Sequence, residues 1–161
     1  MQISRRNLSI GILAVAIATI GATVSLGGAS AKTKTPINTI GSPGVAIKGY
    51  DPVAYFKDGK PRRGSNLYTF KYKGVTWRFA SAENRAAFIA APDKYEPAYG
   101  GYCAYGVAKG ALAKIEPTAW AIRNGRLYLN YDAEVQGNWS KDPAGYIRAA
   151  NGKWPKLVGK K

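Results

Sequence analysis

Two stretches of alternating apolar and polar residues constrain this chain more than any other feature of its sequence. The first, residues 67–79, places bulky apolar side chains at every second position on both sides of Lys73-Gly74. A period of two is typical of strands with one buried face, and the Lys-Gly pair can form a two-residue hairpin turn. On the buried face, the predicted pairs are Phe70 with Trp77 and Tyr68 with Phe79.

The second stretch, residues 120–131, has the same alternation around Asn124-Gly125, which is the strongest short hairpin signal in the chain. The side chains expected to face one another across this turn are Trp120 and Ile122 on one strand and Leu127, Leu129 and Tyr131 on the other. Arg123 and Arg126 flank the turn and are most simply solvated. The two hairpins are unlike in sequence, and we expect no internal repeat beyond them.

Helix signals lie before and after the first predicted hairpin. Asp51 suits the N-cap of a short helical turn. Ser81 suits the N-cap of a helix over residues 82–91. The apolar side of that helix is formed by Phe88 and Ile89, which we expect to be buried.

Short helices are also expected over residues 102–113 and, as one or two segments with a break at 140–143, over residues 132–161. A chain of 161 residues is long enough for one domain with its own core. The predicted fold class is therefore α+β: a small single domain with two antiparallel β-hairpins packed against short helices, preceded by a signal peptide.

Residues 1–31 contain the three parts of a twin-arginine signal peptide in the correct order. Arg5-Arg6 precede an apolar stretch over residues 8–26, and Ala29-Ser30-Ala31 suits cleavage. We expect export to the periplasm with no membrane span after cleavage; retention as an N-terminal membrane anchor is the alternative. The remaining expected parts are a flexible linker at 32–45, a folded domain at 46–157 and a basic tail at 158–161.

The residue types that the chain lacks exclude most enzyme mechanisms. The chain has no histidine and one cysteine, Cys103, which excludes Ser-His-Asp and Cys-His catalysis, histidine zinc sites and an intramolecular disulfide. A net charge of +15 favours anionic partners, but the cations are spread along the chain and export separates it from nucleic acid. We therefore expect no nucleic-acid partner, no cofactor and no self-contained transition-metal site.

Residues 51–95 resemble a YHS domain, a small module similar to metal-binding TRASH-type domains. The matching residues are Asp51-Pro52-Val53, the strand pair at 72–79, Ser81, Phe88 and Pro92-Asp93-Lys94-Tyr95. Where the metal-binding pattern has cysteines, this chain has Ala54, Ala80 and Asn84, so the resemblance does not imply that metal site here.

A more specific resemblance is to exported YHS-containing proteins whose Gly-Gly-Tyr-x-Ala-Tyr segment carries cysteine or selenocysteine. It extends over residues 46–157, with residues 100–105 and 127–131 as its most specific parts. The resemblance implies no established molecular function. It does imply chalcogen chemistry at Cys103, because selenocysteine is more readily explained by reactivity than by packing.

Cys103 is the candidate redox residue of the chain. The residues around it are candidates for ligand binding: Tyr99, Gly100, Gly101, Tyr102 and Tyr105. At or just inside a helix start, free N–H groups and the helix dipole would lower the pKa of the thiol. The thiolate could then exchange with an external thiol, react with peroxide or bind a soft metal ion. The alternative is a small, buried and unreactive thiol.

A second class of function is a non-enzymatic binding module. In this hypothesis Tyr50 joins Tyr99, Tyr102 and Tyr105 around a small ligand or one soft metal ion, with Cys103 as the only thiolate. These tyrosines could instead be packed residues whose hydroxyls reach water. A third class is a structural envelope protein that uses its positive surface. The sequence leaves open whether the protein is an enzyme.

Overall fold

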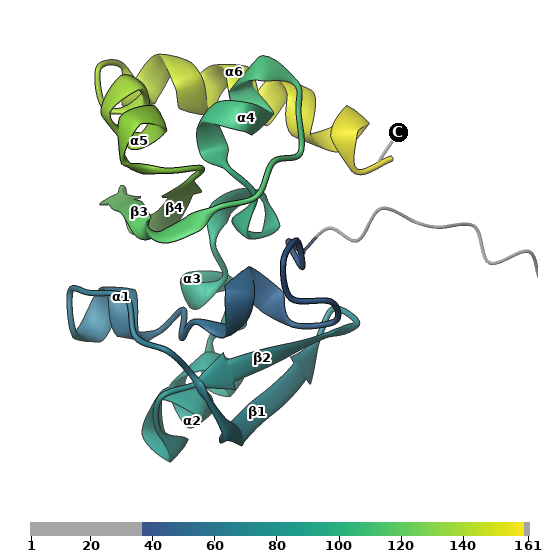
Figure 1. Cartoon of the computed structure of the whole chain (residues 1–161), viewed down its shortest axis with the longest axis vertical. Helices are drawn as coiled ribbons and strands as arrows, with labels where there is room; N and C mark the ends of the chain where they lie inside the picture. The colour runs from purple at the N-terminus through teal and green to yellow at the C-terminus, as the bar shows by residue number, and fades with distance from the viewer. Residues whose placement is uncertain (1–36, 160–161) are drawn as a thin grey trace, which may run out of the picture. The chain divides into compact units, whose positions relative to one another are not determined.

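The computed structural model describes residues 37–159 (Figure 1). The predicted signal peptide, the start of the predicted linker and the end of the predicted tail lie outside this range. In chain order the elements are η1 (Ala46–Gly49), α1 (Ala54–Lys57), β1 (Ser65–Tyr72), β2 (Val75–Phe79), α2 (Ala82–Ala90), α3 (Pro92–Tyr95), η2 (Ala98–Gly101), α4 (Ala104–Lys109), β3 (Glu116–Arg123), β4 (Arg126–Asn130), α5 (Ala133–Trp139) and α6 (Pro143–Leu157); η denotes a 3₁₀ turn. The predicted α+β class is confirmed.

Both predicted hairpins form, and each turn has the left-handed backbone that its sequence favours. Lys73 and Gly74 have φ of 50° and 79°, and Asn124 and Gly125 have φ of 49° and 70°. Positive φ at both central residues gives a turn whose twist matches that of the flanking strands. In Figure 1, α2 lies beside the β1–β2 hairpin and α5 lies beside the β3–β4 hairpin.

The predicted strand register is confirmed near the turns and fails farther away. Phe70 is paired with Trp77 as expected, but Phe79 is opposite Ser65 rather than Tyr68. The cause is an irregularity in β1 between Ser65 and Thr69, which places extra residues on that strand. Alternation alone does not reveal such a bulge, because the residues on either side of it keep a period of two.

The two hairpins are copies of one structure. β3 follows β1 at the same separation along the chain as β4 follows β2, and the strands that correspond have equal lengths. At this constant separation, every residue pair of the first register recurs in the second, including the irregularity before Trp120, the counterpart of Thr69. A shared bulge is stronger evidence for a structural repeat than a shared hairpin, because bulges are specific features of a fold.

The elements around each hairpin repeat as well. The same separation relates the start of α5 to that of α2, and the start of α6 to that of α3. Ser81 Oγ accepts a hydrogen bond from the N–H of the third residue after it, and Asp132 Oδ1 does the same for α5. Phe88 and Trp139 occupy equivalent buried positions. Trp139 Nε1 has no hydrogen-bond partner within residues 37–159.

The 3₁₀ turns that precede each helix–hairpin unit also match. Ile47 and Lys48 in η1 have left-handed φ/ψ values of 41°/47° and 57°/22°, and Tyr99 and Gly100 in η2 have 56°/36° and 57°/20°. We call residues 46–95 the N-terminal repeat and residues 98–146 the C-terminal repeat. The expectation of no internal repeat was therefore wrong, because the copies share backbone geometry while most of their side chains differ.

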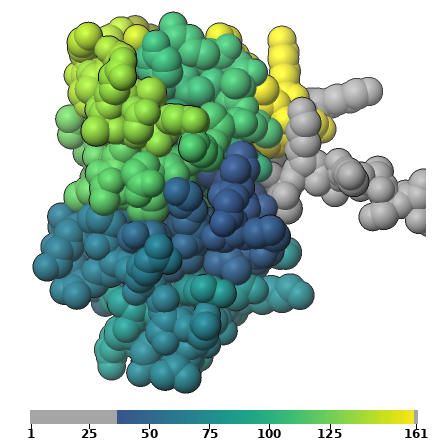
Figure 2. All heavy atoms as spheres, in the orientation of Figure 1, coloured from purple at the N-terminus to yellow at the C-terminus, as the bar shows by residue number. Residues whose placement is uncertain are grey.

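Two predictions need correction: the extent of the flexible linker and the burial of Ile89 in α2. Ile37 and Asn38 are buried, and Asn38 hydrogen-bonds through its N–H to Gly100 O at 2.8 Å and through Nδ2 to Gly101 O at 2.9 Å. The folded chain thus begins within the segment expected to be flexible. In Figure 2 the dark blue start of the described residues borders the green C-terminal repeat. Ile89 is 47% exposed rather than buried, since α2 directs Phe88 and not Ile89 into the core.

The helix expected over residues 102–113 is only Ala104–Lys109, because Gly110 takes a left-handed φ of 91° and ends it. The last predicted region does form two helices, α5 and α6. Asp142 Oδ1 caps α6 by accepting from Gly145 N at 2.8 Å, and Pro143 takes the first helical position as predicted. Within residues 37–159, no helix is long and apolar enough to cross a membrane.

Candidate functional site

Cys103 is the N-cap of α4 and is almost fully buried. Its side chain is 1% exposed, and its sulfur accepts a hydrogen bond from Gly106 N at 3.3 Å. The thiol points toward Asn130, whose Oδ1 lies 3.8 Å from the sulfur and also accepts from Tyr105 N. Burial raises the pKa of the Cys103 thiol, and the N–H groups at Gly106, Tyr131 and Tyr105 only partly oppose it. The expected thiolate-favouring effect of the helix start is therefore outweighed.

The repeat assigns Cys103 a counterpart in Asp51. The carboxylate of Asp51 is fully buried and accepts from Val53 N at 2.8 Å and Ala54 N at 3.3 Å, two and three residues ahead. Tyr105 and Gly106 have the same spacing from Cys103. Each side chain thus caps the first helix of its repeat.

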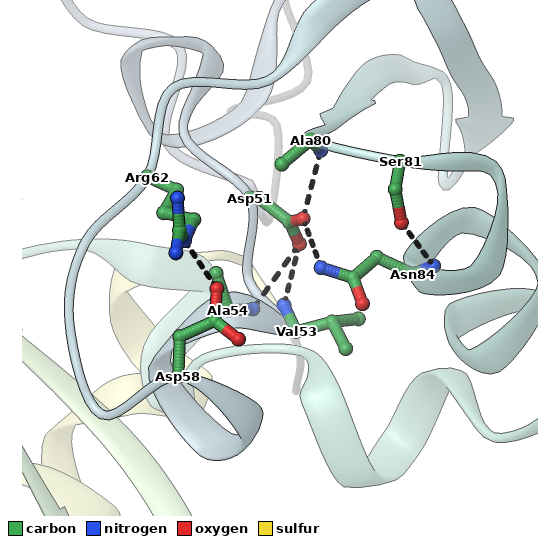
Figure 3. A network of polar contacts seen from close by, with 8 residues as sticks. All are labelled: Asp51, Val53, Ala54, Asp58, Arg62, Ala80, Ser81 and Asn84. Carbon is green, nitrogen blue, oxygen red and sulfur yellow. Dashed lines mark hydrogen bonds and ion pairs between the residues drawn. The ribbon is translucent and has the colours of Figure 1, made fainter.

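Each of these two side chains also reaches the segment that follows the hairpin of its own repeat. Asp51 Oδ2 accepts from Ala80 N at 2.8 Å, and Cys103 receives a hydrogen bond from Tyr131, the counterpart of Ala80. Asp51 Oδ2 additionally accepts from Asn84 Nδ2 at 2.7 Å (Figure 3). Capping a helix and joining it to the hairpin is therefore the role common to both residues.

The Asp51 network brings together the three positions at which the YHS resemblance expects cysteines. Ala54, Ala80 and Asn84 come from α1, the segment after β2, and α2, and each donates a hydrogen bond to the carboxylate (Figure 3). A carboxylate that accepts several hydrogen bonds is well satisfied in a buried position. The carboxylate of Asp51 thus connects α1, the segment after β2, and α2.

The predicted aromatic residues do not share one cavity with Cys103. Tyr99 and Tyr102 pack in one buried cluster with Trp139, whereas Cys103 belongs to another with Trp77. Gly100 and Gly101 are buried in η2, and Tyr105 is half-buried at the edge of both clusters. Tyr50 is half-buried beneath the guanidinium of Arg63, 5.1 Å from its ring centre.

Tyr99 and Gly100 do line a surface depression, formed by two adjoining hollows of about 360 Å³ each. The aromatic hollow is lined by Ala98, Tyr99, Arg126, Tyr128, Asn151 and Trp154. The charged hollow is lined by Lys73, Asp93, Glu96, Pro97, Tyr99, Gly100, Arg126 and Trp154. Because Tyr99, Arg126 and Trp154 line both, the two hollows form one candidate site.

The aromatic walls of the site are fixed by their own contacts. The Tyr99 ring centre lies 5.8 Å from that of Trp154 and 6.0 Å from that of Tyr128. Tyr99 OH donates to Asn151 Oδ1 at 2.9 Å. Burial raises the pKa of Tyr99 and of Tyr128, while the nearby Arg126 acts in the opposite direction. Both phenols are therefore neutral hydrogen-bonding groups at neutral pH.

Arg126 is exposed and makes no ion pair with any residue between 37 and 159. Its positive charge is close enough to Tyr99 and Tyr128 to influence the pKa of both. A guanidinium beside aromatic rings, with no carboxylate of the described chain paired to it, can bind a carboxylate or phosphate in two-pronged geometry.

The site has no polar counterpart in the N-terminal repeat. At the positions of Tyr99, Arg126 and Tyr128, that repeat has Ile47, Val75 and Trp77, all of them buried. Asn151 and Trp154 come from the part of α6 that extends beyond the repeat. The C-terminal repeat therefore differs from its copy at the positions that form the depression.

The sequence indicated Tyr99 and Gly100 but not the other principal residues of the site, namely Arg126, Tyr128 and Trp154. An alignment of the two repeats would have found the first two, because they replace apolar residues of the other copy. Trp154 has no counterpart, so its signal is only an aromatic residue beside Lys153 in a helix.

Residues 37–159 contain no group of three or more acidic or cysteine side chains placed to hold a metal ion. The groups available at the depression are a guanidinium, an ammonium, two carboxylates, phenols and an indole. Such a set suits binding through charge, hydrogen bonds and ring contacts. Compared with known proteins, the chain matches no family model, no curated protein and no solved structure.

Proposed function

We propose that this protein is a non-enzymatic binding module whose depression, lined by Tyr99, Arg126 and Trp154, takes a small ligand with a carboxylate and a flat or bulky apolar group. One observation carries this proposal: Arg126, which has no ion pair among the described residues, lines an aromatic hollow at a position where the other repeat has the buried Val75. A surface that only needed to fold could have kept the apolar residues of the N-terminal copy.

The chemistry of the walls defines the ligand class. Arg126 supplies charge and two-pronged hydrogen bonding, which a carboxylate satisfies. Tyr99 and Trp154 supply ring faces and edges that favour apolar or aromatic groups. A hollow of about 360 Å³ lies at the small end of ligand sites in proteins.

The thiol hypothesis is weaker than the binding hypothesis on this geometry. A reactive cysteine needs exposure and a lowered pKa, whereas Cys103 is buried and has a raised pKa. We therefore assign Cys103 to the capping of α4 and place the ligand at Tyr99 instead. A soft metal ion or an external thiol would have to reach Cys103 through a local opening of the fold.

Separate observations support the proposed family and the proposed location. Convergence of Ala54, Ala80 and Asn84 on one buried carboxylate supports the YHS resemblance, since a metal-binding relative would need the same three positions to meet. The Arg5-Arg6 signal supports export to the periplasm. On this proposal the module binds its ligand outside the cytoplasm.

The test is an NMR titration with 3-phenylpropionate as the anionic probe and 3-phenylpropanamide as its uncharged counterpart. We expect the anion to shift signals of Tyr99, Tyr128 and Trp154, and to bind more tightly than the amide. Arg126→Gln should weaken binding of the anion about tenfold, as expected when a charged hydrogen bond is lost.

Arg123→Gln is the matched control, because Arg123 is the cross-strand partner of Arg126, is also exposed and lies outside both hollows. It removes the same charge from the same hairpin. Equal weakening by the two substitutions would show attraction to the overall positive charge and would overturn the proposed site.

A further inference from the structure

The charged hollow contains two charged side chains of opposite sign that are not neutralised. Asp93 lies at the start of α3 and Arg126 is exposed at the start of β4. Neither makes an ion pair with the other or with any other residue between 37 and 159. The remaining charges, Lys73 and Glu96, neutralise each other, with Lys73 Nζ 2.5 Å from Glu96 Oε2.

We infer that the ligand of this site is a free α-amino acid with a large apolar side chain. This inference rests on the proposed binding function and specifies its ligand. The carboxylate of the amino acid pairs with Arg126, its ammonium pairs with Asp93, and its side chain lies in the aromatic hollow against Tyr99 and Trp154.

The arrangement selects a zwitterion over ligands of a single charge. A ligand with several negative charges would meet the unpaired Asp93, and a ligand with only positive charge would meet the unpaired Arg126. An α-amino acid has an ammonium group and a carboxylate group bonded to the same carbon atom. It can therefore lie between Arg126 and Asp93 and give each of them a partner.

The two hollows also adjoin in the way that such a ligand requires. Tyr99, Arg126 and Trp154 line both, so a molecule with its charged groups in one hollow can extend directly into the other. The second hollow offers three aromatic rings, with Tyr128 as the third, and no carboxylate. The position of the aromatic rings relative to the charges favours phenylalanine, tyrosine, tryptophan or leucine over small or charged amino acids.

The experiment compares L-phenylalanine with analogues that lack one charge. NMR titrations would use L-phenylalanine, 3-phenylpropionate, which lacks the ammonium, and phenethylamine, which lacks the carboxylate. We expect L-phenylalanine to bind about tenfold more tightly than 3-phenylpropionate, and phenethylamine to bind more weakly than both.

Asp93→Asn should abolish the advantage of L-phenylalanine over 3-phenylpropionate while leaving the affinity for 3-phenylpropionate unchanged or slightly raised. Asp58→Asn is the matched control, because it makes the same chemical change outside both hollows, where Asp58 pairs with Arg62. It should leave the preference for L-phenylalanine intact.

The outcomes separate this inference from the proposed function. If 3-phenylpropionate binds as tightly as L-phenylalanine in the wild type, the ligand is anionic and the amino-acid inference fails while the proposed function stands. If neither probe, nor tyrosine, tryptophan or leucine, binds at concentrations up to about 10 mM, both fail. If Asp93→Asn and Asp58→Asn act alike, the role of Asp93 is overturned.

Discussion

At the scale of single residues, the correspondence between Asp51 and Cys103 gives the only cysteine a structural interpretation. Rarity drew attention to Cys103 in the sequence, together with its neighbours and the YHS resemblance. The fold gives it the same task as a buried aspartate in the other repeat, namely to cap a helix and hold the segment after a hairpin. Burial cannot be seen in a local sequence, because the residues that cover Cys103, such as Asn130 and Leu129, come from β4.

The capping role predicts a specific pH dependence of stability. The pKa of Cys103 is raised in the folded protein, so the folded state keeps its proton at pH values where the unfolded chain, with a pKa of about 8.5, has lost it. Stability from this thiol is therefore complete below pH 8.5 and is lost as pH rises toward the folded pKa. Within that window the loss approaches about 1.4 kcal/mol for each pH unit.

The measurement is urea unfolding of wild type and Cys103→Ser between pH 7 and about pH 10. Serine keeps a capping oxygen but does not titrate there, and the tyrosines contribute equally to both proteins. The wild type should lose stability faster with rising pH. Parallel profiles for the two proteins would mean that Cys103 is not protected from ionisation, and would revive the reactive-thiol hypothesis.

At the scale of elements, the turn η2 depends on one glycine for two separate reasons. Gly101 has a φ of 80°, and a Cβ at this position would lie 2.4 Å from Ile47 Cγ2 of the other repeat. Gly125 has a φ of 70° in the second hairpin turn, with open space around the position of a Cβ. The two glycines therefore share a backbone requirement and differ in their surroundings.

Gly101→Ala should destabilise the protein more than Gly125→Ala. The left-handed backbone costs both variants about 1 kcal/mol, and the overlap with Ile47 adds about 1–3 kcal/mol to the first alone. Thermal or urea unfolding of both variants measures the difference. In a double-mutant cycle, Ile47→Ala should relieve part of the extra cost; additive effects of the two substitutions would contradict the contact.

The elements were predictable where local chemistry defines them. Lys73-Gly74 and Asn124-Gly125 determine the hairpin turns, and Ser81 and Asp142 determine helix starts, because these effects act over short distances along the chain. The bulge in β1 and the repeat were not predicted. Their signal is a set of positions matched at a nearly constant separation, such as Pro92 with Pro143, which cannot be seen when each segment is interpreted by itself.

At the scale of the whole molecule, the described residues share a core that crosses the boundary between the repeats. Ile115, Leu127 and Leu129 belong to the same buried cluster as Trp77 and Phe79. Further links join the repeats: Tyr55 OH donates to Pro117 O at 3.0 Å, and Lys48 Nζ lies 3.4 Å from Glu116 Oε2. The N-terminal repeat therefore depends on the C-terminal one to cover its apolar side chains.

We expect the two repeats to unfold in one cooperative transition. In Trp77→Phe, the three remaining tryptophans, Trp120, Trp139 and Trp154, all lie in the C-terminal half of the chain. Their fluorescence should follow urea unfolding with the same midpoint as far-ultraviolet circular dichroism, which reports both repeats. Two separated midpoints would show that the repeats fold independently and that the shared core contributes little.

The candidate site belongs to this scale too, which explains why the sequence revealed so little of it. Its walls come from η2, β4, α6 and the first hairpin turn, and no local pattern connects these segments. Tyr99 was identified only because it neighbours Cys103, and Arg126 was interpreted as a solvated turn residue. Arg126 is distinguished from the other cations of this basic chain only by its place in the fold and by comparison with the N-terminal repeat.

The hydrogen bonds around Asp51 have a practical consequence. The cross-link between α1, α2 and the end of the first hairpin is made by a side chain of the protein itself, through four hydrogen bonds. Neither a chelator nor a reducing agent can remove such a cross-link, and no maturation factor has to deliver its central group. The N-terminal repeat is thus complete as soon as the chain has folded.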